Sequence, residues 1–321
     1  MKNRTILGNL LLLLTAVIWG TAFVFQRVGM DSIEPITFNA ARMWLAAIAI
    51  GLVAVLTGRR EAPQAAAGTG DAVSDDSPVK TTGSADTLDQ DPDRRRNTIV
   101  GGICCGAFLT AASVFQQMGI VYTTAGKAGF ITAMYMLLVP IINFVFFKKK
   151  NTWLVWAGVL IGVVGMYLLC MTEGFSLTYG DTLVCICALL FSGHILCCDH
   201  FVQLGNPIRI SAIQFLTTAV ISSVIALIVE TPSLEKILPA AIPILYCGIV
   251  SGGIGYTLQM VAQKFTDPTI ASLLMSLESV FAVVAGALLL GERMTSRELA
   301  GCIIMFAAIV LVQIPLPARR R

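Results

Sequence analysis

The chain alternates between apolar runs and short polar segments. Ten runs are predominantly apolar over about 20 residues, the length that crosses the hydrocarbon core of a membrane as a helix. Strands would need roughly ten-residue segments of alternating polarity, and none appears. Lipid also requires each crossing segment to satisfy its own backbone hydrogen bonds. The pattern predicts an all-α membrane protein with ten transmembrane helices, at residues 7–27, 36–56, 98–120, 126–147, 152–171, 180–200, 208–229, 238–262, 268–290 and 297–315.

The two halves of the chain share positions in the same order. Pro35 recurs as Pro207 at a shift of 172, and Gln116 recurs as Gln259 at a shift of 143. Five helices is an odd number, so the second half is expected to sit upside down relative to the first. Inverted repeats of this kind are typical of secondary transporters. We therefore predict two inverted five-helix repeats, formed by residues 1–56 with 98–171 and by residues 172–321.

The drop in the shift reflects an extra polar loop in the first half, at residues 57–97. Its middle is rich in Asp, Gly, Ala, Ser and Thr and carries few large apolar side chains. Such a segment cannot bury enough surface to offset the entropy of ordering. We predict a disordered cytoplasmic loop, either as a tolerated insertion or as a regulatory segment.

Charge is sparse and uneven. Only 13% of the 321 residues are charged and 56% are hydrophobic, whereas soluble domains carry about 25% charge. With the N-terminus inside, sixteen Lys and Arg residues fall on the cytoplasmic side and four on the external side. This asymmetry follows the positive-inside rule. It predicts a multi-pass protein of the plasma membrane with both termini cytoplasmic. The net charge of +3 reflects the same bias, so no nucleic-acid partner is expected.

Neither metal nor catalytic chemistry is indicated. The nine cysteines all lie within predicted spans, where adjacent side chains on a helix point about 100° apart. His194, Cys197 and Cys198 share a helical face, and an inert packed face is favoured over a metal site. The chain has no His-Glu-x-x-His pair and no Gly-x4-Gly-Lys-Ser/Thr loop. We expect no enzyme activity and no cofactor.

Two spans contain sequence features that weaken a helix. Pro140 in the fourth span removes a backbone hydrogen bond and should kink it. Ser251-Gly252-Gly253-Ile254-Gly255 in the eighth span is an equally clear weak point. Such points allow a bundle to bend between inward-open and outward-open states, although packing alone would also explain them.

Polar side chains at membrane depth are costly and usually face a cavity, a partner or a pathway. Glu278 lies near the middle of the ninth span, and its counterpart at shift 143 is Tyr135. Two such groups in inverted halves should converge near the pseudo-two-fold axis. Glu278 is a candidate for proton coupling, or alternatively an interhelical anchor. Gln116 and Gln259 form a second equivalent pair, and Asn143 follows Tyr135 by two turns.

Four further residues are candidates for the same site. Arg42 lies about two turns into the second span near Asn39, and a guanidinium binds a carboxylate bidentately. Alternatively, Arg42 reaches the headgroups or pairs with an external acid. His194 is either a packing residue or a proton carrier. Trp19, one turn before Phe23, forms a cavity wall or ordinary packing.

Several stretches resemble the EamA-type proteins of the drug/metabolite transporter superfamily. They include Ile18 to Phe23 with Pro35 and Arg42, Thr123 to Ala128 followed by Pro140, and Ser276 to Phe281 continuing to Leu290-Gly291-Glu292-Arg293. The resemblance covers nearly all of the chain except residues 57–97. It implies ten helices in two inverted repeats around a central cavity. Two positions depart from the family pattern. Lys148-Lys149-Lys150 replaces a Gly-Glu-Arg turn, and Ser279 stands where proline is common, so no kink is implied there.

Together these features predict a secondary transporter, an exporter or permease, that moves a small polar metabolite such as an amino acid by alternating access. A lipid flippase or another lipid-handling membrane protein is the alternative. The expected partners are the solute and the lipid bilayer, and a homodimer is left open. The predicted substrate-binding residues are Arg42, Asn39, Trp19, Gln116, Tyr135, Asn143, Gln259 and Glu278; Glu278 and His194 are the candidates for proton coupling.

Overall fold

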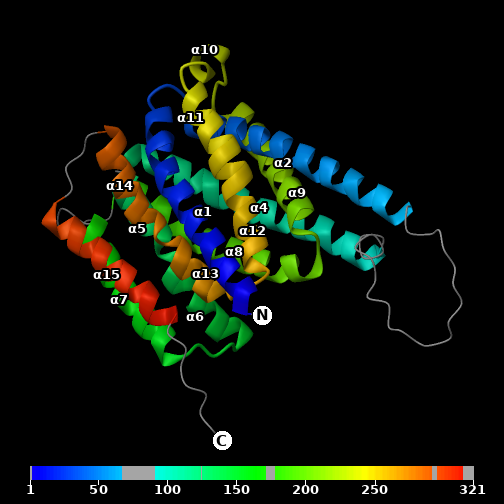
Figure 1. The fold of residues 1–321 in the computed structure, drawn as a ribbon. Helices are drawn as coiled ribbons and strands as arrows, with labels where there is room; N and C mark the ends of the chain where they lie inside the picture. The colour runs from blue at the N-terminus through cyan, green and yellow to red at the C-terminus, as the bar shows by residue number, and fades with distance from the viewer. Residues whose placement is uncertain (1, 67–90, 124, 171–177, 291–294, 314–321) are drawn as a thin grey trace, which may run out of the picture.

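The computed structural model describes residues 2–66, 91–123, 125–170, 178–290 and 295–313 (Figure 1). Every regular element in these residues is a helix. The helices are α1 (Lys2–Gly29), α2 (Pro35–Ala66), α4 (Pro92–Tyr122), α5 (Ala125–Ala133), α6 (Tyr135–Phe147), α7 (Trp153–Cys170), α8 (Tyr179–Leu204), α9 (Pro207–Val229), α10 (Leu234–Ile237), α11 (Ala241–Leu245), η1 (Tyr246–Tyr256), α12 (Thr257–Gln263), α13 (Pro268–Met275), α14 (Glu278–Leu290) and α15 (Ser296–Gln313).

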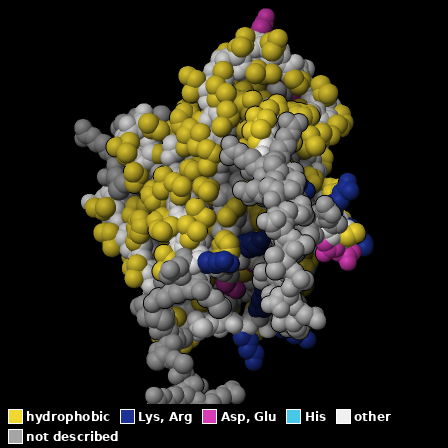
Figure 2. All heavy atoms as spheres, turned by 45° about the vertical axis from the view of Figure 1, so that its right-hand side comes forward, with side chains coloured by type: hydrophobic (Ala, Val, Ile, Leu, Met, Phe, Trp, Pro, Cys, Tyr) yellow, Lys and Arg dark blue, Asp and Glu magenta, His cyan; other side chains and the backbone are white. Residues whose placement is uncertain are grey.

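Eight segments within the described residues are long and apolar enough to cross a membrane. Two further apolar helices are shorter, at Trp153–Leu168 and Leu299–Val312. The exterior has the composition expected of such segments: Leu227 and Ile228 of α9, for example, are 73% and 76% exposed. Figure 2 shows hydrophobic side chains over most of one face, with Lys and Arg mainly toward its lower part. The predicted all-α architecture is confirmed.

Helix bounds recur between the halves. The limits of α6 reappear in α14 at a shift of 143 residues, and those of α7 reappear in α15 at the same shift. Helices α2 and α9 both begin at a Pro-Ile pair. The shared positions seen in the sequence therefore have counterparts in the backbone.

The fourth and ninth spans are each interrupted near the middle. Met134 separates α5 from α6, and Ser276 with Leu277 separates α13 from α14. At the first break, the amide of Leu137 bonds to the carbonyl of Met134 at 2.9 Å, a short-range bond typical of a tightened turn. The interruption lies at Met134, and Pro140 lies further along, inside α6, where its missing N–H does not end the helix. A bend at Pro140 itself stays a prediction.

The ninth span breaks without a proline. Ser276 Oγ donates to the carbonyl of Leu273 at 2.7 Å, and Ser279 Oγ donates to the carbonyl of Ser276 at 2.9 Å. Serine hydroxyls thus satisfy carbonyl groups around the break. The ninth span is therefore interrupted although Ser279 stands where proline is common, and serine hydroxyls bond to the carbonyls around the interruption.

The weak point predicted in the eighth span is confirmed. Residues Tyr246–Tyr256 form a π-helix, η1, which contains Ser251 to Gly255. The indole Nε1 of Trp19 donates to the carbonyl of Ser251 at 3.2 Å. Side chains from α1 therefore bond to the wider turns of this segment.

Helices extend into both ends of the segment 57–97 that was predicted as a loop. Helix α2 continues to Ala66, and α4 begins at Pro92 with Asp91 as its N-cap. Residues 67–90 lie outside the described residues, as do residues 291–294 and 314–321.

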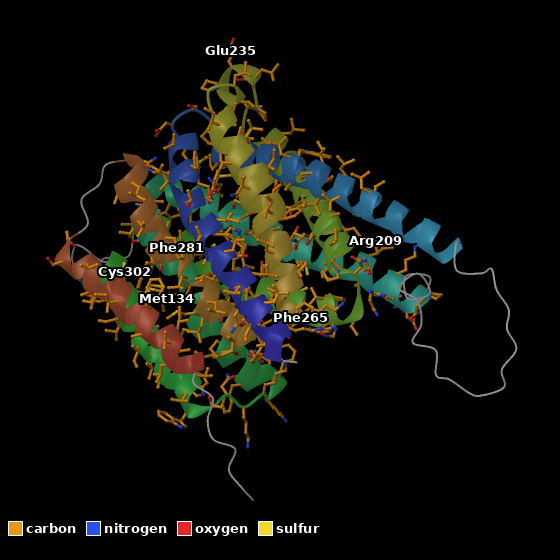
Figure 3. All side chains as sticks on the ribbon, viewed as in Figure 1. Met134, Arg209, Glu235, Phe265, Phe281 and Cys302 are labelled. Atoms are coloured by element: carbon orange, nitrogen blue, oxygen red, sulfur yellow. The ribbon has the colours of Figure 1, made fainter. Side chains whose placement is uncertain are left out.

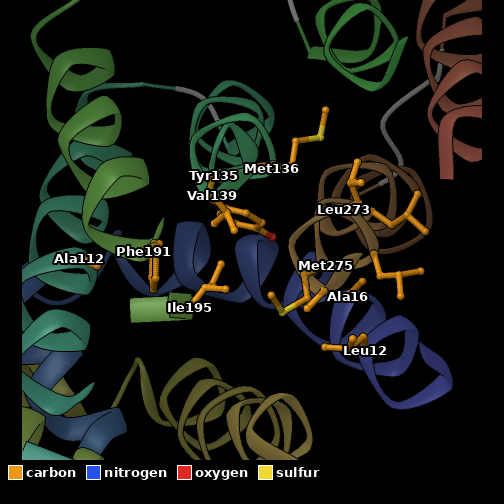
Figure 4. Close-up of a cluster of buried hydrophobic side chains, with 14 of the residues drawn as sticks. Leu12, Ala16, Ala112, Tyr135, Met136, Val139, Phe191, Ile195, Leu273 and Met275 are labelled. Carbon is orange, nitrogen blue, oxygen red and sulfur yellow. The ribbon is translucent and has the colours of Figure 1, made fainter. Parts of the chain in front are cut away.

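A single large group of buried apolar side chains joins the central helices. Figure 4 shows Leu12 and Ala16 of α1 beside Met275 of α13, and Phe191 of α8 beside Tyr135 of α6. This core surrounds the breaks, so the polar groups at the breaks are held by packing from several helices.

Candidate functional site

A buried cavity lies among α1, α2, α4, α5, α6, α8, η1 and α14. The volume of this cavity is about 30 Å³, whereas small-molecule sites typically measure about 300–1,000 Å³. The structure is therefore contracted here, and any solute larger than water requires the helices to move apart. The residues identified from the sequence that line the cavity are Trp19, Phe23, Arg42, Gln116, Tyr135 and Glu278; the others are Ala22, Gln26, Thr132, Phe191, Ser251 and Tyr256.

Tyr135 and Glu278 meet in this cavity. Each is the first residue of the second segment of a broken span. Tyr135 Oη donates to Glu278 Oε1 at 3.0 Å, and the two residues are only 2% and 3% exposed. The N-terminus of a helix favours a negative charge through its aligned peptide dipoles. The break therefore places the Glu278 carboxyl where the backbone of α14 stabilises a charge.

Arg42 is buried in the same cavity, at 5% exposure. Its Nε and Nη2 atoms donate to Asn39 Oδ1 at 3.0 and 2.8 Å. Among the described residues no carboxylate lies within ion-pair distance of Arg42. Asp31 contacts Arg27 instead, and Glu34 contacts Lys236. The alternatives of headgroup contact or pairing with an external acid are therefore wrong.

Asn39 orients Arg42 and is itself held from two other helices. Its Nδ2 donates to Ser113 Oγ of α4 and to Ser222 Oγ of α9, both at 3.0 Å. Asn39 is fully buried and lies behind the guanidinium rather than on the cavity wall. Of the two predicted residues, Arg42 faces the cavity and Asn39 positions Arg42.

The first helix contributes one wall of the cavity. Trp19 packs against the ring of Tyr256, with centroids 4.6 Å apart. Gln26 is 4% exposed, and its Oε1 has no hydrogen-bond partner among the described residues. Trp19, Phe23 and Gln26 are spaced by four and three residues, which places them on one helical face. That spacing is the signal by which Gln26 could have been found in the sequence.

Gln116 and Thr132 form a polar patch on the opposite wall. Gln116 Nε2 donates to Thr132 Oγ1 at 3.3 Å. Thr132, Phe191, Ser251 and Tyr256 were not predicted as cavity residues from the sequence, because nothing in the helical period distinguishes their faces from ordinary core. Their role in the lining is visible only in the assembled bundle.

The remaining predicted residues lie outside this cavity. His194 Nε2 lies 3.1 Å from Gln214 Oε1, and the imidazole also packs edge-on against Tyr256, with ring centroids 5.8 Å apart. Gln259 Nε2 donates to Gln263 Oε1 at 3.0 Å. The carbonyl of Asn143 accepts the amide of Lys149 at 3.1 Å, near the end of α6. These three residues are buried beside the cavity or away from it.

Comparison with known proteins agrees with this architecture. The model of the EamA-like transporter family matches residues 6–171 and 178–314. The chain belongs to the EamA-like transporter family. An "Uncharacterized transporter" of Archaeoglobus fulgidus is 27% identical over 315 residues, which span 97% of this chain and 87% of that protein. A solved crystal structure of a protein shares 16% identity, covers 98% of this chain and 97% of its own, and has a TM-score of 0.70.

This membership confirms the resemblance to the drug/metabolite transporter superfamily. The chain is a multi-pass membrane transporter of the EamA-like family. In the cavity just described, buried polar groups and open space coincide.

Proposed function

We propose that the chain is a secondary transporter that moves a small zwitterionic metabolite, such as an amino acid, by alternating access. The observation that carries this proposal is the placement of Arg42 and Glu278 on one buried cavity without direct pairing between them. A guanidinium suits the carboxylate of a solute, and a carboxylate suits an ammonium group. Buried charges are costly unless they meet partners, so an amphoteric solute would complete the site.

The proposal includes ten membrane crossings in two inverted five-helix repeats, with residues 57–97 as a cytoplasmic loop between helices of the first repeat. The recurrence of helix bounds at a shift of 143 supports it, as does the match of the family model over two stretches. The shorter apolar helices α7 and α15 would supply the remaining crossings. The distribution of Lys and Arg supports cytoplasmic termini in the plasma membrane.

Alternating access needs elements that bend, and three spans offer them. The fourth and ninth spans are broken beside the cavity, and η1 of the eighth span is a π-helix. Such interruptions in spans are typical of transporter sites near the midplane. The contracted cavity is consistent with a state between inward-open and outward-open forms.

Solute binding is tested on purified protein in a thermal-shift screen of the standard L-amino acids, followed by uptake into proteoliposomes. An amino acid that stabilises the wild type should not stabilise Arg42→Gln. The matched control is Arg27→Gln, because Arg27 is exposed and pairs with the exposed Asp31 just beyond the end of α1. Unchanged stabilisation and uptake in Arg42→Gln would refute the site. A co-purified lipid, with no response to amino acids, would favour lipid handling instead.

Proton coupling through Glu278 is tested separately. Uptake driven by a pH gradient should be lost in Glu278→Gln, since the amide cannot exchange a proton, while counterflow exchange persists. Glu235→Gln on α10 is the control for removal of an acid, because its side chain lies at the exposed end of the bundle (Figure 3). Proton-driven uptake that survives Glu278→Gln would remove this role and leave the carboxyl as a structural anchor.

A further inference from the structure

A second, larger cavity opens at the end of the bundle that holds the N-terminus. It is a shallow depression open to solvent, and the water-sized space over it is about 330 Å³, comparable in size to a small-molecule site. Its wall includes Lys149 from the segment after α6, Asp199 of α8, and Gln263 to Asp267 at the end of α12. Figure 3 labels Phe265, one of its lining residues, at the end of the molecule opposite Glu235.

Lys149 and Asp199 approach each other in this cavity without a close hydrogen bond between them. Lys149 Nζ and Asp199 Oδ2 are 3.8 Å apart, whereas a charge-assisted hydrogen bond measures about 2.7–2.9 Å. The side chain of Lys149 is 54% exposed and that of Asp199 is 20% exposed, so the pair lies near the surface with the carboxylate the more shielded partner. Asp267 Oδ1 accepts the amide of Thr269 at 2.9 Å and caps α13. Lys264 adds a second ammonium group to the lining.

A constrained turn after α6 positions Lys149 on the wall of this cavity. Lys148 closes α6 in the left-handed conformation, with φ of 53°, and its amide bonds to the carbonyl of Asn143. A left-handed conformation is uncommon for a residue other than glycine and indicates a constrained turn. The turn directs the chain back across the end of α8, where Asp199 lies. The Lys149–Asp199 approach is therefore a product of defined backbone geometry.

We propose that this cavity is a second binding site for the same zwitterionic solute, with the solute ammonium at Asp199 and its carboxylate at Lys149 and Lys264. We call it the outer site because it lies at the end of the bundle, which is the cytoplasmic end in the proposed topology. Opposite charges several ångströms apart, in a cavity of sufficient volume, match the charge separation of an amino acid. The solute would replace the long Lys149–Asp199 contact by two shorter charge-assisted bonds.

One helical face connects this cavity to the central one. Tyr256 lines the central cavity and Gln263 lines the outer cavity. Gln259 lies between them at a spacing of three and four residues, which places all three on one face. Gln259 donates to Gln263, and the Oε1 of Gln259 is buried with no hydrogen-bond partner among the described residues.

An orphaned buried carbonyl oxygen is costly, so Gln259 Oε1 marks a point where a passing polar group gains a bond. Gln263 Nε2 also donates to the carbonyl of Ile195 at 3.0 Å, which ties this ladder to α8. The amide ladder thus leads from the outer site to the wall of the central cavity.

This inference rests on the proposed function, and binding stoichiometry separates the two. The probe is a mixture of tritium-labelled standard L-amino acids, measured by equilibrium dialysis against the full chain in nanodiscs. The wild type should show two classes of site, of which the outer one weakens with salt, because its charges are near the surface. Lys149→Gln and Asp199→Asn should each weaken the outer class by about tenfold or more, since each removes a charged partner.

Lys150→Gln is the matched control, because Lys150 is exposed in the same segment but outside the lining. Arg42→Gln should remove the central class and keep the outer class. If Lys149→Gln and Asp199→Asn bind like the wild type while Arg42→Gln loses binding, the outer site is refuted and the proposed function stands. If the wild type binds none of the amino acids, both are overturned. Lys149→Gln remains informative even if Asp199→Asn misfolds.

Discussion

The two halves of the transporter agree at one pair of spans and differ at another. The fourth and ninth spans are broken at equivalent positions, Met134 and Leu277, by different residues. The third and eighth spans diverge: α4 is a regular helix, whereas the eighth span contains the π-helix η1. The position of the break is therefore shared, while the distortion of the neighbouring span belongs to one half alone.

Glycines of η1 differ from the residues at the equivalent positions of α4. Gly248, Gly252 and Gly255 of η1 occupy positions where α4 carries larger residues, Cys105, Leu109 and Ala112. A Cβ atom at Gly248 would lie 2.8 Å from the Arg42 carbonyl, and one at Gly255 would lie 2.7 Å from Trp19 Nε1. The eighth span thus needs glycine at these positions to approach α1 and α2.

The largest effect is expected from filling that approach. Gly255→Leu forces the side chain into Trp19 and disrupts its bond to the carbonyl of Ser251. Overpacking of this kind costs roughly 1–3 kcal/mol, and we expect the upper end because the indole is held by η1 itself. Unfolding of the purified protein in detergent measures the loss. Gly51→Leu is the control, since nothing lies within 4 Å of a Cβ at Gly51. Equal losses in the two variants would show that the glycines of η1 have no special packing role.

A smaller effect is expected at the break that both halves share. Tyr135→Phe removes the hydroxyl that donates to Glu278 Oε1. The loss of this hydrogen bond should cost about 1–2 kcal/mol, the range that model peptides give for a bond between helices in a membrane. Glu278→Gln retains an oxygen acceptor for Tyr135 and should lose less. Tyr167→Phe, on an exposed position of α7, should be neutral. If Tyr135→Phe is also neutral, the two breaks are joined by packing alone.

The pairing of Tyr135 with Glu278 was predictable from the sequence, because equivalent depth in repeated halves brings two residues to the same level. The contact between Asn39 and Arg42 follows similarly from their spacing of three residues on a helix. The break at Met134 was not predictable, since the residue has no intrinsic tendency to end a helix. The 3.8 Å approach of Lys149 to Asp199 was also not predictable. Helical periodicity assigns faces but does not give distances between helices distant in the sequence.

The starts of the second and seventh spans extend the comparison of the halves. Asn206 caps α9 locally, with its Oδ1 accepting the amides of Ile208 and Arg209 at 3.1 and 3.3 Å. In the first half, the amides of Ile36 and Thr37 are bonded by the carboxylate of Glu230 at the distant end of α9. Asn206→Ala should cost about 1 kcal/mol, whereas Asn206→Gly should cost only a few tenths. The midpoint of thermal unfolding measures the difference. Comparable losses in both variants would contradict a capping role.

The smallest effect is expected at Glu34, the residue that corresponds to Asn206 in the first half. Glu34 does not cap its helix but pairs with Lys236, and the hydrogen bond from Lys236 lowers the pKa of the Glu34 carboxyl from its usual value of 4.5. A lowered folded-state pKa means that this stabilisation is present at pH above the unfolded value and is lost as the pH falls through the folded one. Because the pair is near the surface, it should contribute less than about 1 kcal/mol.

Wild type and Lys236→Gln should therefore differ slightly in unfolding free energy at neutral pH and converge in acid below the usual carboxyl pKa. Glu235→Gln, one residue away on α10, should show no such convergence. High salt should also reduce the difference, because exposed charges are screened. A difference that persists unchanged in acid would mean that Lys236 acts through packing of its aliphatic stem. The start of α2 would then be stabilised electrostatically by Glu230 alone. The two halves would differ here in one respect: a residue distant in the sequence caps α2, whereas the adjacent Asn206 caps α9.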